Sequence, residues 1–319
     1  MMAVRYHEHG DADVLGVDEV ARPTPGEGEV LVEMRAASVN PVDVMIRSGE
    51  YGAVPLPSVP GGDGAGIVAA VGAGVDRFET GDRVFASGMD RASGGTFAEY
   101  AAIPETKLAH LPGDVPFEVG GALGNVGATA WTALEEVAGV RAGDRVLVHG
   151  GAGGVGHAAV QIAASGGADV VATAGSEEAR DRVRDLGAST ALDYGSDSLA
   201  EDVLAATGGE GVETVIDHRL EEYLGLDLRV LAEGGRVVSL MGHVPATSGV
   251  PLYEKEVTVR ALRMDNRPVR RPVLERLVRL LERGDLTAAV ADTYDLGEAD
   301  RAHRDVLAGG YVGKLVVTP

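Results

Sequence analysis

A glycine-rich segment at residues 151–156, with the sequence GAGGVG, is the strongest chemical signal in the chain. It fits the G-x-G-x-x-G pattern and lies between an apolar run at residues 145–149 and a stretch of helical periodicity at residues 155–165. In this setting the glycines permit a tight turn, a close approach of backbone N–H groups to a pyrophosphate, and close packing of helix on strand. The helix start adds the positive end of its dipole. The motif therefore predicts dinucleotide binding.

The end of the next predicted strand, at residues 169–174, indicates which dinucleotide is bound. NAD enzymes usually carry a carboxylate about 20 residues after the loop, where it accepts hydrogen bonds from the ribose. Here Gly175 and Ser176 follow the strand and leave room for a 2′-phosphate, and Arg180 lies one helical turn further on. Glu177 and Glu178 oppose that positive charge if they face the same site. The pattern favours NADP(H) and leaves NAD(H) as the alternative.

The elements that position the loop alternate between strands and helices. This alternation predicts βαβ units and an α/β fold with a parallel, doubly wound sheet. The expected strands are residues 145–149, 169–174, 191–193, 214–217 and 236–240, and the expected helices are residues 120–138, 155–165 and 176–186.

The two ends of the chain have a different character. The first ~110 residues are rich in short strand-like runs and turn signals, with one or two short helices expected, the best near residues 40–48, which indicates a β-barrel or sandwich. Residues 272–283 predict an amphipathic helix whose apolar stripe faces the core, and residues 314–317 predict a final strand.

Composition restricts the function classes. The 319 residues include 28 Lys and Arg, 49 Asp and Glu and no cysteine, for a formal charge of −21. The missing cysteine excludes disulfides, thiolate catalysis and zinc sites with Cys ligands. The acidic charge disfavours nucleic-acid binding, and no apolar run reaches the ~20 residues that span a bilayer. The start of the chain shows no signal peptide, so a cytoplasmic protein is expected.

Lysine is unusually scarce. Lys107, Lys255 and Lys314 are the only three in the sequence. A GC-rich genome would produce this bias, and so would adaptation to high salt, where surplus surface carboxylates are screened. Both interpretations stay open, and the dependence of stability on KCl concentration separates them.

Four segments carry a resemblance to a known family. These are residues 40–43 (NPVD), 46–49 (IRSG), 60–66 (PGGDGAG) and 148–156 around the glycine loop. Together they resemble the NADPH:quinone oxidoreductases, which include zeta-crystallin and form the zinc-free branch of the medium-chain dehydrogenase/reductase superfamily. The resemblance covers nearly the whole chain. It implies a GroES-like catalytic domain at residues 1–120 and 259–319, a Rossmann domain at residues 121–258, and a homodimer.

The resemblance also implies a set of site residues. Asn40 would lie in the catalytic cleft near the nicotinamide, Met45 stands where relatives often have a tyrosine, and Tyr51 remains as a polar group in the cleft. Arg180 is next to Ala179, where some relatives use a lysine for the 2′-phosphate. The remaining implied cofactor contacts are Thr129, Ala152, Gly153, Gly154, Val155, Gly175, Ser176, Tyr194, Gly242, Leu262 and Met264.

The implied reaction is NADPH-dependent reduction of a quinone without a metal. Zinc-dependent relatives carry a ligating histidine where this chain has Gly62, and alcohol oxidation without that Lewis acid is disfavoured. The alternatives are an enone or 2-enoyl-thioester reductase on the same scaffold, or a nucleotide-binding protein with little turnover. Asp63 is expected to brace a turn, His149 to be structural and Arg219 to form a surface ion pair. No general acid stands out, so solvent is expected to protonate the product.

Overall fold

The structure is a computed structural model that describes residues 1–52, 54–89, 94–243, 253 and 255–319. The chain forms two units: Met1–Ala128 with Arg267–Pro319, here called unit 1, and Thr129–Asn266, here called unit 2. The boundaries expected from the sequence, after residues 120 and 258, fall a few residues earlier in the chain.

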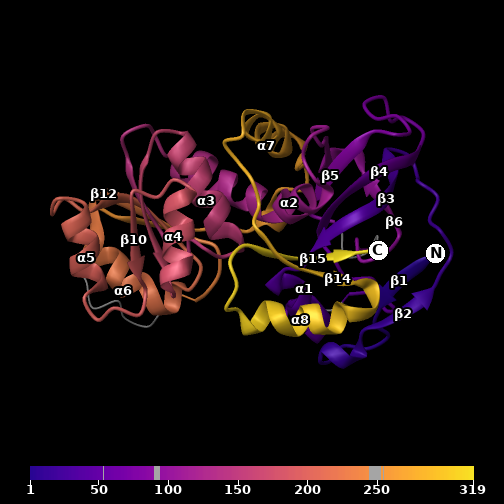
Figure 1. Ribbon diagram of the computed structural model, residues 1–319, viewed down its shortest axis with the longest axis horizontal. Helices are drawn as coiled ribbons and strands as arrows, with labels where there is room; N and C mark the ends of the chain where they lie inside the picture. Colours follow the sequence, from indigo (N-terminus) through magenta and orange to yellow (C-terminus); the bar gives the residue numbers. More distant parts are fainter. Residues whose placement is uncertain (53, 90–93, 244–252, 254) are drawn as a thin grey trace. The chain divides into compact units, whose positions relative to one another are not determined.

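Unit 2 contains a six-stranded parallel sheet with the order β10-β9-β8-β11-β12-β13 (Figure 1). This order, in which the first strand of the unit lies at the centre and the chain winds outward in both directions, is that of dinucleotide-binding folds. The predicted α/β class is confirmed. The strands are β8 (Arg145–Val148), β9 (Asp169–Ala174), β10 (Thr190–Asp193), β11 (Val212–Asp217), β12 (Leu231–Ser239) and β13 (Thr258–Ala261).

Helices cover this sheet because its strands are apolar on both faces. Leu147 and Val215 of the central strands pack with Leu220, Leu224 and Leu228 in one buried cluster, which also contains residues of the preceding helix. The helices of unit 2 are α3 (Gly154–Ser165), α4 (Glu177–Asp185), α5 (Leu199–Ala206) and α6 (Leu220–Val230), and residues Met264–Asn266 form a 3-10 turn.

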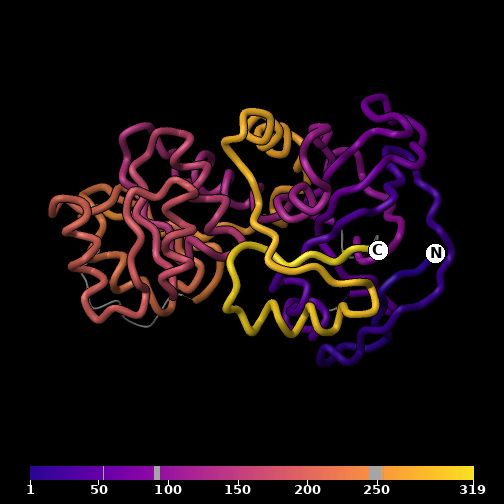
Figure 2. The backbone as a smooth tube through the Cα atoms, viewed as in Figure 1, coloured from indigo at the N-terminus to yellow at the C-terminus, as the bar shows by residue number. Residues whose placement is uncertain are grey.

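Unit 1 is β-rich, as predicted. A seven-stranded sheet has the order β14-β15-β3-β4-β5-β7, with β6 paired to β3, and β1 and β2 form a separate pair. Figure 2 shows the C-terminal tube running among the N-terminal segments, where β15 pairs antiparallel with β3. The strands are β1 (Met2–Arg5), β2 (Gly16–Glu19), β3 (Glu29–Ser38), β4 (Asp63–Val71), β5 (Arg83–Ser87), β6 (Tyr100–Pro104), β7 (Leu108–His110), β14 (Val290–Asp295) and β15 (Lys314–Thr318).

The predicted helices of unit 1 are present. Those near residues 40–48 and 272–283 are α1 (Pro41–Ser48) and α7 (Arg271–Arg283), and α7 buries Leu274, Leu277 and Leu281 and ends at the left-handed Gly284. The stretch expected to be one helix over residues 120–138 is instead α2 (Phe117–Trp131), followed by a π-helical segment, Thr132–Ala138. The helices that were not predicted are α5 and α6 of unit 2 and α8 (Ala299–Ala308) of unit 1, and unit 1 also has three unpredicted 3-10 turns, Ala12–Val14, Glu105–Lys107 and Leu296–Glu298.

Candidate active site

The glycine loop of unit 2 is packed so tightly that side chains are excluded from it. A Cβ added to Gly156 would collide with the carbonyl oxygen of Gly150, and one on Gly151 would lie 2.9 Å from the Cβ of Ala172. Gly150 itself has a φ of 63°, in the left-handed region. The loop therefore brings the start of α3 against the end of β8, which leaves the first N–H groups of α3 as an anion-binding end.

Hydrogen bonds to the neighbouring strand hold the loop in place. The Gly150 N–H donates to Thr173 Oγ1 at 3.1 Å, and the Gly151 N–H donates to the Thr173 carbonyl at 2.8 Å. Thr173 is fully buried in β9. Of the predicted pyrophosphate contacts in the loop, Ala152 is 8% exposed, whereas Gly153, Gly154 and Val155 are half-buried. These features fit the dinucleotide that the sequence predicts.

The predicted 2′-phosphate residues gather at the end of β9. The Tyr194 hydroxyl packs so closely on Gly175 that a side chain at Gly175 would collide with it. Ser176 caps α4 by accepting a hydrogen bond from the Ala179 N–H at 3.1 Å. Arg180 lies beside this end of the strand, where its Nη1 donates to the Ala174 carbonyl at 3.4 Å.

A carboxylate that the sequence analysis missed already pairs with Arg180. Asp193, the last residue of β10, places Oδ2 at 3.0 Å from Arg180 Nη1. Adjacent parallel strands end at the same edge of a sheet, and β10 pairs with β9 so that Asp193 lies opposite Ala174. The position of Asp193 at the end of a predicted strand was therefore a sign that it lies near Arg180. A bound 2′-phosphate would compete with this carboxylate for the guanidinium.

The other predicted cofactor contacts of unit 2 follow its outer strands. Gly242, after β12, has a φ of 106° and lies against the Glu221 carboxylate. Leu262 follows β13 and is 7% exposed, whereas Met264 and Thr129 are half-buried. The glycine loop, Gly175 and these segments after β12 and β13 thus lie at the carboxyl ends of parallel strands, the edge at which α/β folds bind ligands. Their roles toward a cofactor stay predictions.

Beneath the loop lies a buried polar cluster. His149 stacks on Tyr223 with ring centroids 4.2 Å apart, and its Nε2 lies 2.9 Å from Asp227 Oδ1. Burial lowers the pKa of His149 to about 4, so the ring is neutral. The structural role predicted for this histidine is confirmed. Burial raises the pKa of the neighbouring Asp217 to about 7 and that of Asp227 to about 8.

The predicted catalytic residue of unit 1, Asn40, belongs to a second buried network. Its side chain is 3% exposed, and Lys314 Nζ donates to Asn40 Oδ1 at 2.7 Å. Asn40 Nδ2 donates to Asp63 Oδ1 at 2.9 Å. Because lysine only donates and a carboxylate only accepts, these partners fix the orientation of the amide.

Asp63 ties three segments together. Its carboxylate accepts hydrogen bonds from the Ser38 hydroxyl, from the Asn40 amide, and from the Asn125 N–H at 2.8 Å. Asp63 thus has a bracing role, but the prediction that it braces a turn is wrong, because its partners belong to β3, the start of α1 and α2. Burial raises the pKa of Asp63 and lowers that of Lys314, and the attraction between the two charges opposes both shifts.

A pocket in unit 1 opens beside this network. It has a volume of about 40 Å³ and is lined by Asp43, Tyr6, Ser58, Ile46, Gly62 and Met89 among others. This volume is enough for a few water molecules. Two further predicted residues, Met45 and Tyr51, are half-buried in α1 and just after it, and the Tyr51 N–H donates to the Met45 carbonyl at 3.1 Å.

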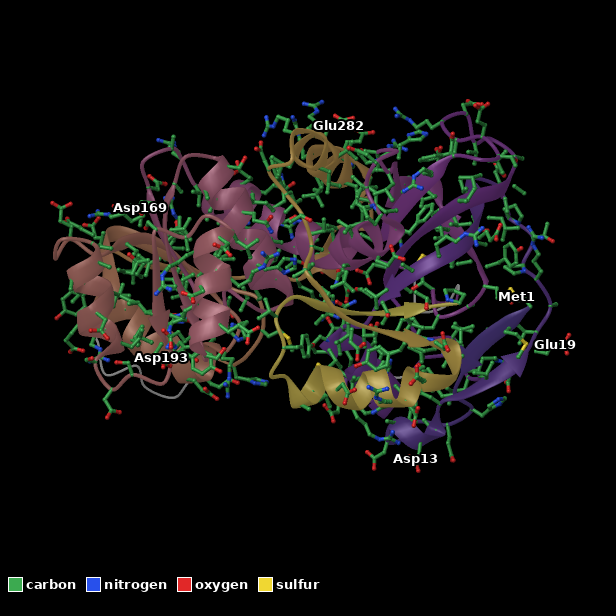
Figure 3. The ribbon with its side chains drawn as sticks, viewed as in Figure 1. Met1, Asp13, Glu19, Asp169, Asp193 and Glu282 are labelled. Carbon is green, nitrogen blue, oxygen red and sulfur yellow. The ribbon has the colours of Figure 1, made fainter. Side chains whose placement is uncertain are left out.

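Acidic side chains dominate the surface. Asp13, Glu19, Asp169 and Glu282 are exposed and project from the ribbon in Figure 3. Arg219 forms the predicted surface ion pair, with Glu222. Over the described ranges, no helix combines the length and apolarity needed to cross a bilayer.

Comparison with known proteins shows the class of protein to which the chain belongs. A family model described as "Alcohol dehydrogenase GroES-like domain" matches residues 26–113, and one described as "Zinc-binding dehydrogenase" matches residues 154–282. These two models, in this order, and the fold of the two units define a medium-chain dehydrogenase/reductase.

Individual relatives define the family. The quinone oxidoreductase of Lama guanicoe is 36% identical over 99% of this chain and 97% of its own length. The structure of Escherichia coli quinone oxidoreductase complexed with NADPH is 30% identical, with a TM-score of 0.89 and both chains fully covered. The chain belongs to the quinone oxidoreductase family, as its resemblance indicated, and is an enzyme of the oxidoreductase class.

Two further solved structures show how widely this scaffold is used. An NAD-dependent alcohol dehydrogenase is 32% identical, with a TM-score of 0.93 and full coverage of both chains. The CurK enoyl reductase is 27% identical, with a TM-score of 0.87, and the match covers 99% of this chain and 98% of that one.

The residues present do not fit the zinc that the second family description implies. The sequence has no cysteine, and Gly62 offers no ligand atom from a side chain. Within the part of the chain that the structure describes, no group of three or more His, Asp or Glu residues could hold a metal ion.

Proposed function

We propose that this enzyme reduces quinones with NADPH and without a metal. The observation that carries the proposal is the close-packed glycine loop at the start of α3, in a chain that is similar to quinone oxidoreductases over its whole length. When bound, NADPH supplies a hydride. A quinone is already electrophilic, so its reduction needs orientation and exclusion of water more than a Lewis acid.

The chain's own residues would bind and orient the reactants. The loop residues Ala152–Val155 would hold the pyrophosphate, and Gly175, Ser176, Tyr194 and Arg180 would hold the 2′-phosphate. Arg180 supports NADP(H) over NAD(H) because a phosphate can replace Asp193 as its partner. Around the nicotinamide we propose Asn40, Met45 and Thr129, with Gly242, Leu262 and Met264 flanking it, and Tyr51 as a polar group near the acceptor.

An enone or 2-enoyl-thioester reductase is the second candidate. The likeness to the CurK enoyl reductase supports it, since the same scaffold there carries that name. Both acceptors take a hydride at an electron-poor centre, so the choice depends on what fits beside the unit 1 pocket. The third candidate is a family member that binds the nucleotide but turns over little with these acceptors, and Met45 in place of tyrosine supports it.

We further propose that the protein is a cytoplasmic homodimer. Among the described strands, β13 is an edge of the unit 2 sheet, and three of its four residues are exposed. An exposed edge strand is a template for pairing with another chain. Light scattering that shows a monomer at every salt concentration would contradict the dimer.

The experiment follows NADPH or NADH oxidation with 1,4-benzoquinone, 9,10-phenanthrenequinone and a simple enone, in low and in molar KCl. Quinone-dependent oxidation of NADPH, with NADH much poorer, is the expected result. Turnover of the enone alone would select the second candidate. Binding of NADPH without turnover in any salt would select the third.

A further inference from the structure

Asp43 differs from Asp63, the other carboxyl buried beside Lys314, in what its oxygens contact. Oδ2 accepts a hydrogen bond from the Asn40 N–H at 2.8 Å, which closes the first turn of α1. Oδ1 faces Gly62, because a Cβ built on that glycine would lie 3.8 Å from it with no other atom in range. Asp43 is only 3% exposed, yet it lines the unit 1 pocket. A buried carboxyl oxygen thus faces a space that is large enough for water.

The charge balance of the network decides which carboxyl carries a proton. Asp63 and Asp43 are both buried beside one ammonium group, that of Lys314. Asp63 accepts hydrogen bonds from three residues, Ser38, Asn40 and Asn125, whereas the hydrogen bonds to Asp43 come from Asn40, through its backbone N–H and its side chain. Hydrogen bonds stabilise the ionised form, and two carboxylates near each other do not both ionise readily. Asp63 is therefore the carboxylate that balances Lys314, and Asp43 is the neutral acid.

We propose that Asp43 supplies, through water in the unit 1 pocket, the proton that the reduced acceptor needs. This inference rests on the proposed function. Hydride addition leaves the acceptor as an oxyanion, either a hydroquinone anion or an enolate. A water molecule in the pocket gives its proton to that anion and takes one from Asp43 Oδ1. Asp43 is left as a carboxylate and regains a proton from solvent, so one hydride and one proton are consumed per turnover.

The electrostatic surroundings support this role. Burial and, next, the negative charge of Asp63 raise the pKa of Asp43 to about 7, against the opposing effects of the Asn40 N–H, the Lys314 ammonium and the Asn40 side chain. Tyr6, after β1, also interacts with Asp43. A pKa near the working pH is optimal for a proton donor. Because the acid form donates, kcat should fall as the pH rises above about 7.

The direct test observes the proton without any turnover. In the cofactor-free protein, the carboxyl ¹³C NMR signal that is lost in Asp43→Asn should titrate near pH 7. A signal that shows Asp43 ionised already at pH 5 would overturn the proposal.

The kinetic test compares acceptors that differ in their need for a proton. Tetramethyl-1,4-benzoquinone gives a basic hydroquinone anion, whereas tetrachloro-1,4-benzoquinone gives an anion stable without protonation. Asp43→Asn should lower kcat on the order of 10²-fold with the tetramethyl quinone. It should change kcat less than twofold with the tetrachloro quinone, and it should remove the fall of kcat above pH 7.

Two variants distinguish proton donation by Asp43 from its role in capping α1. Asp43→Glu keeps a capping acid, so activity and a pH-dependent kcat should return. Glu298→Gln is the matched control, because Glu298 accepts from the Asp295 N–H in the same kind of capping box on the surface. It should leave kcat unchanged. An equal loss on both quinones in Asp43→Asn, or an unchanged pH profile, overturns the proton role. Wild-type protein that binds NADPH but reduces no acceptor overturns the proposed function itself, and the proton role with it.

Discussion

Replacing Lys314 with methionine should destabilise unit 1 by about 3–5 kcal/mol. Lys314 is 3% exposed, and its Nζ donates to the Val39 carbonyl at 2.6 Å and to Asn40 Oδ1 at 2.7 Å. Each hydrogen bond to a charged donor contributes about 1.5–3 kcal/mol. Removal of the ammonium also leaves the Asp63 carboxylate buried without its counter-charge, and breaking such a pair typically costs about 3–5 kcal/mol. Methionine fills a similar volume, so a cavity adds little to the loss.

The loss of stability caused by Lys314→Met should depend on Asp63. In Lys314→Met/Asp63→Asn the uncompensated carboxylate is gone, so at least about 1.5 kcal/mol of the loss should be recovered. Without the ammonium, the pKa of Asp63 rises further. The destabilisation caused by Lys314→Met should therefore become smaller as the pH is lowered and protonation neutralises the carboxylate.

The assay is urea unfolding followed by two signals. Far-UV circular dichroism reports both units, whereas fluorescence comes from the single tryptophan, Trp131, which belongs to unit 2. Lys314→Met should shift the unit 1 transition and leave the fluorescence transition nearly unchanged. Lys255→Met is the control, because among the described residues Lys255 Nζ donates to backbone carbonyls near the end of α6 in unit 2, so its loss should shift the fluorescence transition and leave the unit 1 transition nearly unchanged. A loss below about 1 kcal/mol in Lys314→Met, or no recovery with Asp63→Asn, would refute the reasoning.

Three further predictions concern unit 2 and the surface. Asp193→Asn should free Arg180 and tighten NADPH binding about two- to fivefold, with NADH unchanged in fluorescence titrations; an equal change for both cofactors would exclude a contact with the 2′-phosphate. Burial raises the pKa of Asp227 to about 8, well above its unfolded value, so the free energy of unfolding should fall as the pH rises from about 4 to 8. In thermal unfolding followed by Trp131 fluorescence, Asp227→Asn should make this fall less steep, and an unaltered slope would contradict the prediction. If the charge of −21 reflects adaptation to high salt, the midpoint of thermal unfolding should rise between low and molar KCl, and a flat response would favour genome composition.

The unit 2 loop could be predicted from the sequence because its chemistry is local. The glycines, the strand before them and the helix after them are contiguous, so one pattern fixes all three. The same applies to Ser176, whose capping role depends on residues within one helical turn. Helix α6 was not predicted, although its pattern is local as well: Leu220, Leu224 and Leu228 repeat at helical spacing and are all buried.

The unit 1 network could not be predicted because its members are far apart in the chain. Asn40 lies 23 residues from Asp63 and 274 residues from Lys314. A lysine at the start of a strand normally indicates a solvent-exposed position, since lysines are almost never fully buried without a partner. Only the antiparallel pairing of β15 with β3 brings Lys314 beside Asn40 and Asp63. Asp43 was visible as part of the NPVD motif, but nothing in the sequence shows that Oδ1 faces a pocket.

The burial of Lys314 has a consequence for Asn40. A chain that contains only three lysines buries one of them almost completely, beside two carboxyls. The ammonium holds the amide oxygen of Asn40, and Asp63 holds its amide nitrogen, so the side chain cannot rotate without breaking two charge-assisted hydrogen bonds. The backbone N–H of the same residue donates to Asp43 Oδ2. Asn40 therefore sets the position of Asp43, while the carboxylate of Asp63 neutralises the positive charge of Lys314. One ammonium shared between two carboxyls leaves a single proton on the carboxyl that faces the pocket, which is the arrangement a proton donor requires.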